Sequence, residues 1–191
     1  MSSHRFEIAG TWNGEPLLSR EEARVELVLG DTVEIRVDAT YYDDPAPCDA
    51  PARLDGLWEF EVVELFLLGT HHRYLEIELG PHGHWLALYL EGQRRIVDDD
   101  IAIAFEAHRT SGHWSGRAVF DRACLPEGLG WANVYSIHGV GPHRRYLAMT
   151  PVLGEVPDFH RVESFDPIPD YSIQTHAFRG GPPSKDGSSS R

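Results

Sequence analysis

The sequence predicts an all-β fold, an antiparallel β-sandwich, on three observations. Apolar and polar residues alternate through most of the chain, which is the pattern of strands with one buried face. Gly, Pro, Asp and His residues interrupt this alternation about every 8 to 12 residues, a spacing typical of sandwiches and barrels. Helical periodicity is confined to one turn at residues 122–125. We expect a jelly-roll-like sandwich of about ten strands, with a barrel as the alternative.

The first predicted element is a hairpin, with strands at 25–29 and 32–38 joined through Gly30 and Asp31. Residues 41–57 contain too many prolines for a strand, because Pro cannot donate a ladder hydrogen bond, and we expect a long loop of functional interest there. The remaining strands are predicted where the alternation resumes, at 58–68, 73–79, 84–91, 101–109, 113–120, 132–138 and 144–149.

The chain of 191 residues is long enough for one domain with a substantial core. We place this single β-sandwich domain at residues 1–178. Residues 179–191, with the sequence RGGPPSKDGSSSR, contain too little apolar surface to pack against a core. They are expected to form a flexible C-terminal tail.

Composition narrows the classes of function. The chain carries 30 acidic and 17 basic residues, a net charge of −13, so it repels polyanions and nucleic acid is not an expected partner. No apolar stretch reaches the ~18 residues of a membrane span, so no membrane partner is expected. The start lacks the apolar run of a signal peptide, and Cys48 and Cys124 cannot form a disulfide framework. We expect a cytoplasmic protein.

The candidate site lies between Trp58 and Leu90, in three strands predicted to be neighbours. A four-residue turn at 80–83 would pair Glu78 with Trp85, and side chains then alternate between the two faces of the sheet. The side chains that this register directs toward the core are Val63, Leu65, Leu67, Leu75, Ile77, Leu79, His84, Leu86 and Leu88. It gathers carboxylates and aromatic rings on the opposite face, namely Glu64, Tyr74, Glu76, Glu78, Trp85 and Tyr89.

A bulge near Val62 would extend this acidic face. It would bring Glu59 and Glu61 to the same side as the other carboxylates, and it would leave Trp58 and Phe60 in the core. Neighbouring carboxylates repel one another and raise each other's pKa, so a ligand, a cation or Arg side chains should compensate them.

A sugar is the ligand that this pattern favours. The C–H faces of a sugar ring stack on aromatic rings, while its hydroxyl groups donate hydrogen bonds to carboxylates. The alternative is a solvated outer face on which the carboxylates pair with arginines of other strands, such as Arg73, Arg117 or Arg145.

Metal ions are alternative ligands. His82 and His84 share a strand face and could chelate a transition metal, although the sequence has no H-E-x-x-H motif and no paired C-x-x-C motif. Calcium is allowed but not required, either at the acidic face or at Asp43 and Asp44. The absence of a G-x-S-x-G motif and of a phosphate-binding Gly-rich loop disfavours serine hydrolases and nucleotide-binding enzymes.

Two motifs carry a family resemblance, WEFEVVE at 58–64 and YLEIELGPHG at 74–83. Through them the chain resembles, over about residues 5–166, a family of small proteins of unknown function with vertebrate and bacterial members. More remotely, it is similar to family-9 carbohydrate-binding modules and DOMON-like domains. The resemblance implies a β-sandwich, sugar binding between aromatic side chains, and structural calcium in some relatives. It also adds candidate contacts at His138, Asp158 and His160.

These observations favour a protein that binds a small saccharide or sugar-like metabolite on the acidic face, with His82 at its rim. One alternative is a carboxylate- or metal-dependent hydrolase or lyase acting on a sugar derivative, in which two of the three glutamates exchange protons. Another is a scaffold that binds a protein partner through residues 41–57.

Overall fold

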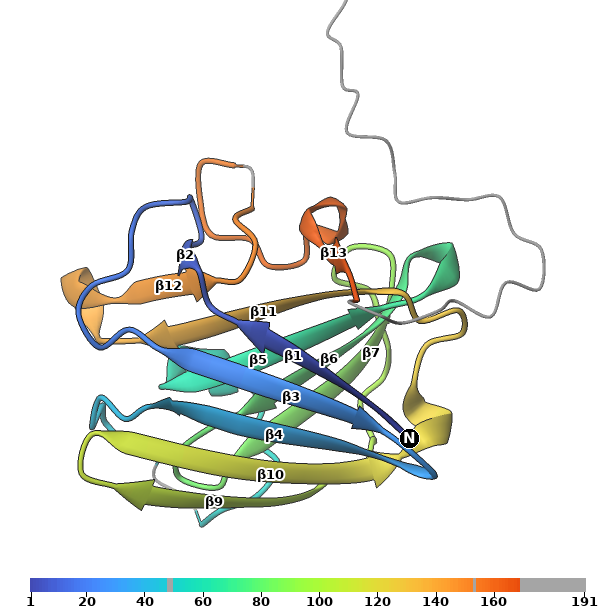
Figure 1. Cartoon of the computed structure of the whole chain (residues 1–191), viewed down its shortest axis with the longest axis horizontal. Coiled ribbons are helices and arrows are strands. Elements are labelled where there is room, and N and C mark those ends of the chain that lie inside the picture. The colour runs from blue at the N-terminus through green and yellow to red at the C-terminus, as the bar shows by residue number, and fades with distance from the viewer. Residues whose placement is uncertain (48–49, 153, 169–191) are drawn as a thin grey trace, which may run out of the picture.

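The computed structural model of the chain describes residues 1–47, 50–152 and 154–168 (Figure 1). These residues form two antiparallel sheets that pack face to face, which confirms the predicted β-sandwich and not the barrel. The predicted tail at 179–191 and the end of the predicted domain, 169–178, lie outside the described residues, as does Cys48.

The first sheet has five strands in the order β1-β3-β4-β10-β9. Their bounds are β1 (Ser2–Glu7), β3 (Ala23–Leu29), β4 (Thr32–Thr40), β9 (Ala104–Thr110) and β10 (His113–Asp121). The predicted hairpin is present as β3 and β4, with Leu29 paired to Val33. The alternation had not identified β1, which pairs with β3 along its whole length.

The second sheet has eight strands, with the order β2-β12-β11-β5-β6-β7-β8 and with β13 also paired to β11. Their bounds are β2 (Gly10–Thr11), β5 (Val62–Leu68), β6 (Arg73–Leu79), β7 (Trp85–Glu91), β8 (Ile96–Asp98), β11 (Trp131–His138), β12 (Arg145–Ala148) and β13 (Asp166–Pro167). The helical residues among those described are single 3-10 turns: η1 (Leu57–Glu59), η2 (Thr70–His72), η3 (Arg122–Cys124), η4 (Gly141–His143) and η5 (Val162–Ser164). The turn predicted at 122–125 is therefore confirmed as η3. None of these short helices has the length or hydropathy needed to span a membrane.

The main core lies between the two sheets. Alternate residues of both sheets meet there, such as Val33 and Ile35 from β4 and Leu75 and Ile77 from β6, all without solvent exposure. The outer face of the five-stranded sheet is charged instead, and its acids pair with arginines, as Arg117 does with a carboxylate of β4. Exposed pairs of this kind contribute little to stability but keep that face in water.

The outer face of the eight-stranded sheet is buried too. A second apolar cluster includes Phe66, Tyr74 and Tyr135 from the sheet and Phe159 and Phe165 from the chain that covers it. Every residue of β5 is buried as a result, and so are all residues of β6 except the first. Glutamates on this face therefore lie inside the protein, whereas the sequence analysis placed them on a surface.

The hairpin between β6 and β7 differs by one residue from the predicted register. Leu79 pairs with Trp85, so five residues separate the paired ends. The Gly80 N–H donates to the His84 carbonyl at 2.9 Å, and Gly83 has a φ of 85°, in the left-handed region that glycine tolerates. The turn is thus one residue longer than the predicted turn at 80–83.

This one-residue difference inverts both faces of β7, because side chains alternate along a strand. The predicted pairing of Glu78 with Trp85 is wrong, since Glu78 pairs with Leu86. Trp85 and Tyr89 pack against the core between the sheets, and Leu86 and Leu88 belong to the outer cluster. The aromatic rings predicted from β7 therefore do not share a face with the glutamates.

Replacement of Leu75 by Ala tests the core between the sheets. Leu75 has no solvent exposure and packs on both layers, so L75A should lower the free energy of unfolding by about 2 to 5 kcal/mol. The matched variant L18A truncates a side chain that is 60% exposed and should change it by about 0.5 kcal/mol or less. Chemical denaturation measures both values, and equal effects would contradict the assigned core.

Candidate functional site

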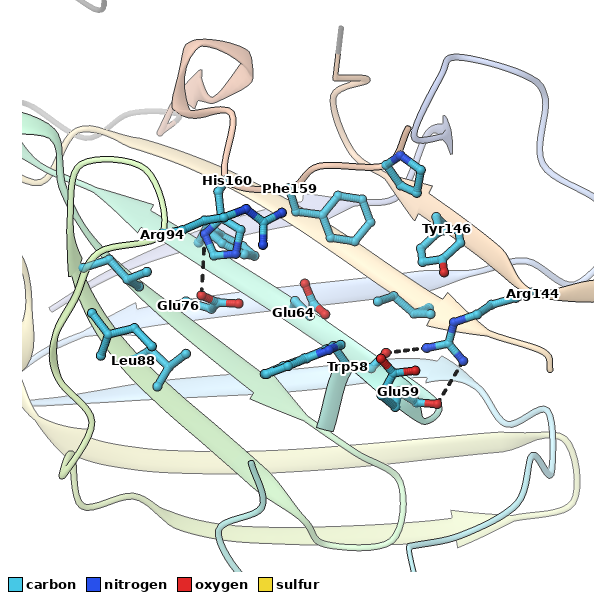
Figure 2. Close-up of a pocket in the computed structure, with 15 residues that line it drawn as sticks. Trp58, Glu59, Glu64, Glu76, Leu88, Arg94, Arg144, Tyr146, Phe159 and His160 are labelled. Atoms are coloured by element: carbon cyan, nitrogen blue, oxygen red, sulfur yellow. Dashed lines mark hydrogen bonds and ion pairs between the residues drawn. The ribbon is translucent and has the colours of Figure 1, made fainter. Parts of the chain in front are cut away.

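A pocket of about 350 Å³ opens on the outer face of the eight-stranded sheet. This volume is within the ~300 to 1,000 Å³ usual for small-molecule sites. Side chains from β5, β6 and β7 form its floor, and its walls come from η1, the turn after β7, the start of β12 and residues 157–160. Figure 2 shows Glu64 and Glu76 on this floor, with Trp58 on one side and Phe159 and Tyr146 on the other.

Three glutamates meet at the floor. Glu64 on β5 pairs with Glu78 on β6, as predicted, and Glu76 is the next residue on the same face of β6. Glu64 is 2% exposed, Glu76 is 4% exposed and Glu78 is fully buried. Glu64 and Glu76 line the pocket, whereas Glu78 does not. We call these three residues the acidic floor.

No Arg or Lys among the described residues forms an ion pair of 4.0 Å or less with the acidic floor. Oε2 of Glu76 and both carboxylate oxygens of Glu78 are buried and have no hydrogen-bond partner in the described part of the chain. Buried polar atoms are normally satisfied, so the unpartnered Oε2 of Glu76, a residue that lines the pocket, indicates a group that is held ready for a ligand.

The arginines proposed to neutralise this face pair elsewhere, so that prediction is wrong. Arg73 lies 3.8 Å from Glu91, and Arg145 lies 2.7 Å from Glu21. Arg117 belongs to the five-stranded sheet and lies 2.6 Å from Glu34 of that same sheet. The reason is topological, because these arginines are on strand ends or on strand faces that point away from the acidic floor.

Burial raises the pKa of all three carboxyl groups, because it disfavours their charged forms. For Glu76 burial raises the pKa to about 7, against the opposing effects of its interaction with the Glu78 carboxyl group and of the charge of Arg94. The pKa of Glu64 is raised well above its ordinary value by burial and by the charge of Glu76, and that of Glu78 by burial and by the charges of both neighbours. The acidic floor thus holds its protons to a higher pH than ordinary carboxyl groups do.

His160 connects the floor to the wall of the pocket. Its Nδ1 lies 2.8 Å from the Tyr74 hydroxyl and 3.9 Å from Oε2 of Glu76. The Arg94 backbone N–H donates to the same hydroxyl, which leaves the hydroxyl proton free to be donated to Nδ1. Burial and the charge of Arg94 lower the pKa of His160 to about 4, so the ring is neutral at pH 7 and supplies no charge to Glu76.

The chain at 157–165 forms one wall and is fixed by aromatic contacts. The Phe159 ring stacks on Tyr135 at 3.8 Å with an interplanar angle of 5°, and Phe165 meets the edge or face of Phe66 and Tyr74. Because this wall packs through rings on the same sheet that carries the glutamates, wall and floor are held in a fixed relation.

Two arginines flank the pocket at opposite ends (Figure 2). Arg94 pairs with Asp158 at 2.8 Å. Arg144 donates to the carbonyl oxygens of Trp58, Glu59 and Gly139 and lies over the ring of Tyr146. Each guanidinium is therefore already held by the protein, one by a carboxylate and the other by carbonyl groups.

The structure brings only part of the predicted site together. Glu64, Glu76 and His160 line the pocket, while Tyr74 and Asp158 contact its lining residues from behind. Glu78 lies in the floor below them. This group combines residues from the acidic pattern with residues that only the family resemblance had suggested.

The other predicted site residues lie elsewhere. Trp85 and Tyr89 face the inter-sheet core, for the reason of register given above. His82, at the tip of the β6–β7 hairpin, contacts Tyr41 and Arg109. His138 is buried, stacks on Tyr42 at 3.6 Å and bonds to Glu21 at 3.1 Å. None of these four residues lines the pocket.

The predicted bulge near Val62 is wrong, because the chain before β5 forms the 3-10 turn η1. Glu59 lines the pocket, but Glu61 points elsewhere and accepts hydrogen bonds from the backbone N–H groups of Tyr42 and Asp44 at 3.0 and 3.4 Å. These bonds attach the start of the predicted 41–57 loop to the sheet. Burial raises the pKa of Glu61 to about 7.

Several pocket residues were missed by the sequence analysis. Trp58, expected in the core, is 44% exposed at the pocket mouth because η1 turns it outward. Tyr146 and Phe159 lie within the span of the family resemblance, about residues 5–166, but had no predicted role, and no pattern pointed to Arg94 or Arg144. Loop residues of this kind enter a pocket through tertiary packing, which strand alternation does not encode.

The acidic floor does not have the geometry of a metal site. Within the described residues, no group of three or more His, Cys, Asp or Glu side chains is arranged to hold a metal ion. Near one suggested calcium position, Asp43 accepts a hydrogen bond from Tyr41, and Asp44 accepts one from the Gly139 N–H. Both aspartates therefore have protein partners.

Replacement of Glu76 by Gln tests the retained proton. Because the folded protein holds this proton at a pH where the unfolded chain has lost it, Glu76 contributes less stability as the pH rises from about 4.5 to about 7. The free energy of unfolding of E76Q should therefore rise relative to that of wild type over this pH range. The expected gain is about 3 kcal/mol, because a difference of one pKa unit corresponds to ~1.4 kcal/mol.

Denaturation at several pH values measures this difference, with E106Q as the control for a carboxylate on the exposed face of the other sheet. E106Q should follow wild type. A stability difference between E76Q and wild type that stays constant from acid to neutral pH would show that Glu76 titrates normally.

Solved structures resemble this chain in fold. A candidate carbohydrate-binding protein from Bacteroides uniformis ATCC 8492 superposes with a TM-score of 0.64 at 15% identity, over 86% of this chain and 84% of its own. A family-9 carbohydrate-binding module from Caldicellulosiruptor kristjanssonii, solved with cellotriose, gives a TM-score of 0.45 at 15% identity, over 70% and 68%. At 15% identity the first likeness establishes a shared β-sandwich fold.

Comparison with known sequences identifies the family of this chain. No protein-family model matches the chain. The UPF0462 protein C4orf33 homolog of Rattus norvegicus is 38% identical over 173 residues, covering 85% of this chain and 86% of the relative. The Danio rerio homolog is 33% identical over 180 residues, with 89% of each chain covered, and human C4orf33 is 35% identical over 170 residues, with 84% and 85% covered. The chain therefore belongs to the UPF0462 (C4orf33) family.

Proposed function

We propose that this protein binds a small saccharide or a sugar-like metabolite in the pocket above the acidic floor. The observation that carries the proposal is the combination of an exposed indole, Trp58, with the buried carboxyl groups of Glu64 and Glu76 in one cavity. A sugar ring needs an apolar platform for its C–H face and polar groups at its edge, and the pocket offers both.

The walls extend this argument. Trp58 lies on one side of the floor, with Phe159 and Tyr146 on the other (Figure 2), so a ring entering between them has aromatic surface on both sides. The carboxyl groups below hold their protons to a higher pH than ordinary carboxyl groups do, and a protonated carboxyl group both donates to and accepts from sugar hydroxyls. The fold shared with the Bacteroides uniformis candidate carbohydrate-binding protein supports the same proposal.

A second candidate function is hydrolysis or elimination on a sugar derivative. One observation favours it, since Glu76 has its pKa raised to about 7 and lies beside a second carboxyl group, Glu64, whose pKa is also raised well above its ordinary value. Such a pair suits one group acting as base and the other as acid. Turnover of glycosides that is lost in E76Q would favour this function over binding alone.

Replacement of Trp58 by Ala tests the binding proposal. The wild-type protein should show saturable binding to at least one mono- or oligosaccharide in a glycan array, confirmed by calorimetric titration. W58A should weaken that binding about tenfold or more through loss of ring stacking, while its stability changes little because the indole is 44% exposed.

The matched control is V97A, which removes a 49% exposed apolar side chain from β8 outside the pocket. This variant should bind as wild type does. Absence of saturable binding by the wild-type protein across mono- and oligosaccharides would reject the proposal, and equal binding by W58A and wild type would reject the role given to Trp58.

A further inference from the structure

We infer that the ligand of this pocket carries a primary amine, and that an amino sugar binds in preference to the corresponding neutral sugar. This inference rests on the proposed function and names its ligand class. It follows from the acidic floor, where Glu64, Glu76 and Glu78 meet, where no Arg or Lys of the described residues forms an ion pair with them, and where Oε2 of Glu76 has no hydrogen-bond partner.

The buried oxygens identify where the cation would bind. Glu76 is 4% exposed, lines the pocket, and leaves its Oε2 without a hydrogen-bond partner in the described chain. Glu64 lines the same cavity at 2% exposure. A group that enters between Trp58 and Phe159 therefore reaches two carboxyl groups that water barely reaches, and an ion pair there is weakly screened.

The cations nearest to the floor are already engaged. Arg94 pairs with Asp158 at 2.8 Å, and Arg144 is held by backbone carbonyl groups. His160 lies 3.9 Å from Glu76 but is neutral at pH 7, because burial and the charge of Arg94 lower its pKa to about 4. The protein itself thus leaves the carboxyl groups to be compensated by protons or by a ligand.

An organic cation fits this floor better than a metal ion. The described residues offer no group of three or more ligating side chains arranged for a metal. An ammonium group needs only hydrogen-bond acceptors and has three donors of its own, which suits carboxylates on neighbouring strands. On binding, the ammonium takes the place of the proton that Glu76 otherwise holds, and the hydroxyl groups of the same ring remain free to bond with Glu64 and His160.

The test compares matched ligands by calorimetric titration of the wild-type protein at pH 7. Glucose, galactose and mannose are each compared with the 2-amino sugar and with its N-acetyl derivative, which keeps the nitrogen but removes its charge. We expect at least one 2-amino sugar to bind about tenfold or more tightly than both its neutral parent and its N-acetyl form, as charge-assisted bonds in a buried site imply.

The variant E76Q completes the test. It replaces a carboxyl group by an amide of similar size and so removes the charge. The affinity ratio of the amine to its neutral parent should therefore fall to near one in E76Q, whatever the change in affinity for the neutral sugar itself. The control E106Q removes a carboxylate from the exposed face of the other sheet and should keep the full preference.

The outcomes separate the two proposals. Saturable binding of neutral sugars with no gain from any of the three amines overturns the amine inference and leaves the proposed function standing. No saturable binding of any neutral or amino sugar overturns both. An amine preference that persists unchanged in E76Q also overturns the inference, because a group other than Glu76 would then bind the ammonium.

Discussion

The structure of this protein depends on one constraint, the burial of three glutamates on a sheet face with no paired cation. A charged group inside a protein is costly unless it is paired, so burial forces these carboxyl groups to keep protons or to bind something. Glu64, Glu76 and Glu78 meet because two neighbouring strands place them in register. Their raised pKa values and the unsatisfied oxygens of Glu76 and Glu78 follow from that placement.

The second constraint is the cover over that face. An open sandwich would leave the outer face of the eight-stranded sheet in water, as the outer face of the five-stranded sheet is, with its acids paired to arginines. Here the chain at 157–165 packs its rings onto Tyr135, Phe66 and Tyr74 and excludes water from the glutamates. The cover is incomplete above Glu64 and Glu76, and the gap is the pocket. A sheet face of ordinary β-sandwich construction thus becomes a polar cavity with apolar walls.

Sequence reasoning predicted the fold and the acidic floor because both depend on alternation along strands. The pairing of Glu64 with Glu78 and the core positions of Leu75 and Ile77 followed from period two alone. The site's aromatic residues could not be predicted that way. One extra residue in the 80–84 turn sent Trp85 to the core, and the ring that flanks the acids, Trp58, comes from a 3-10 turn whose direction depends on tertiary packing.

The protonation state of the acidic floor tests this account most directly. The side-chain carboxyl carbons of Glu64, Glu76 and Glu78 can be assigned with single Glu→Gln variants and followed by carbon-13 NMR through a pH titration of the free protein. The account predicts that the Glu76 carboxyl titrates near pH 7 and that Glu64 and Glu78 also titrate well above the ordinary value of 4.5. Three titrations at or below that ordinary value would show that the floor is solvated or paired, and would contradict the account.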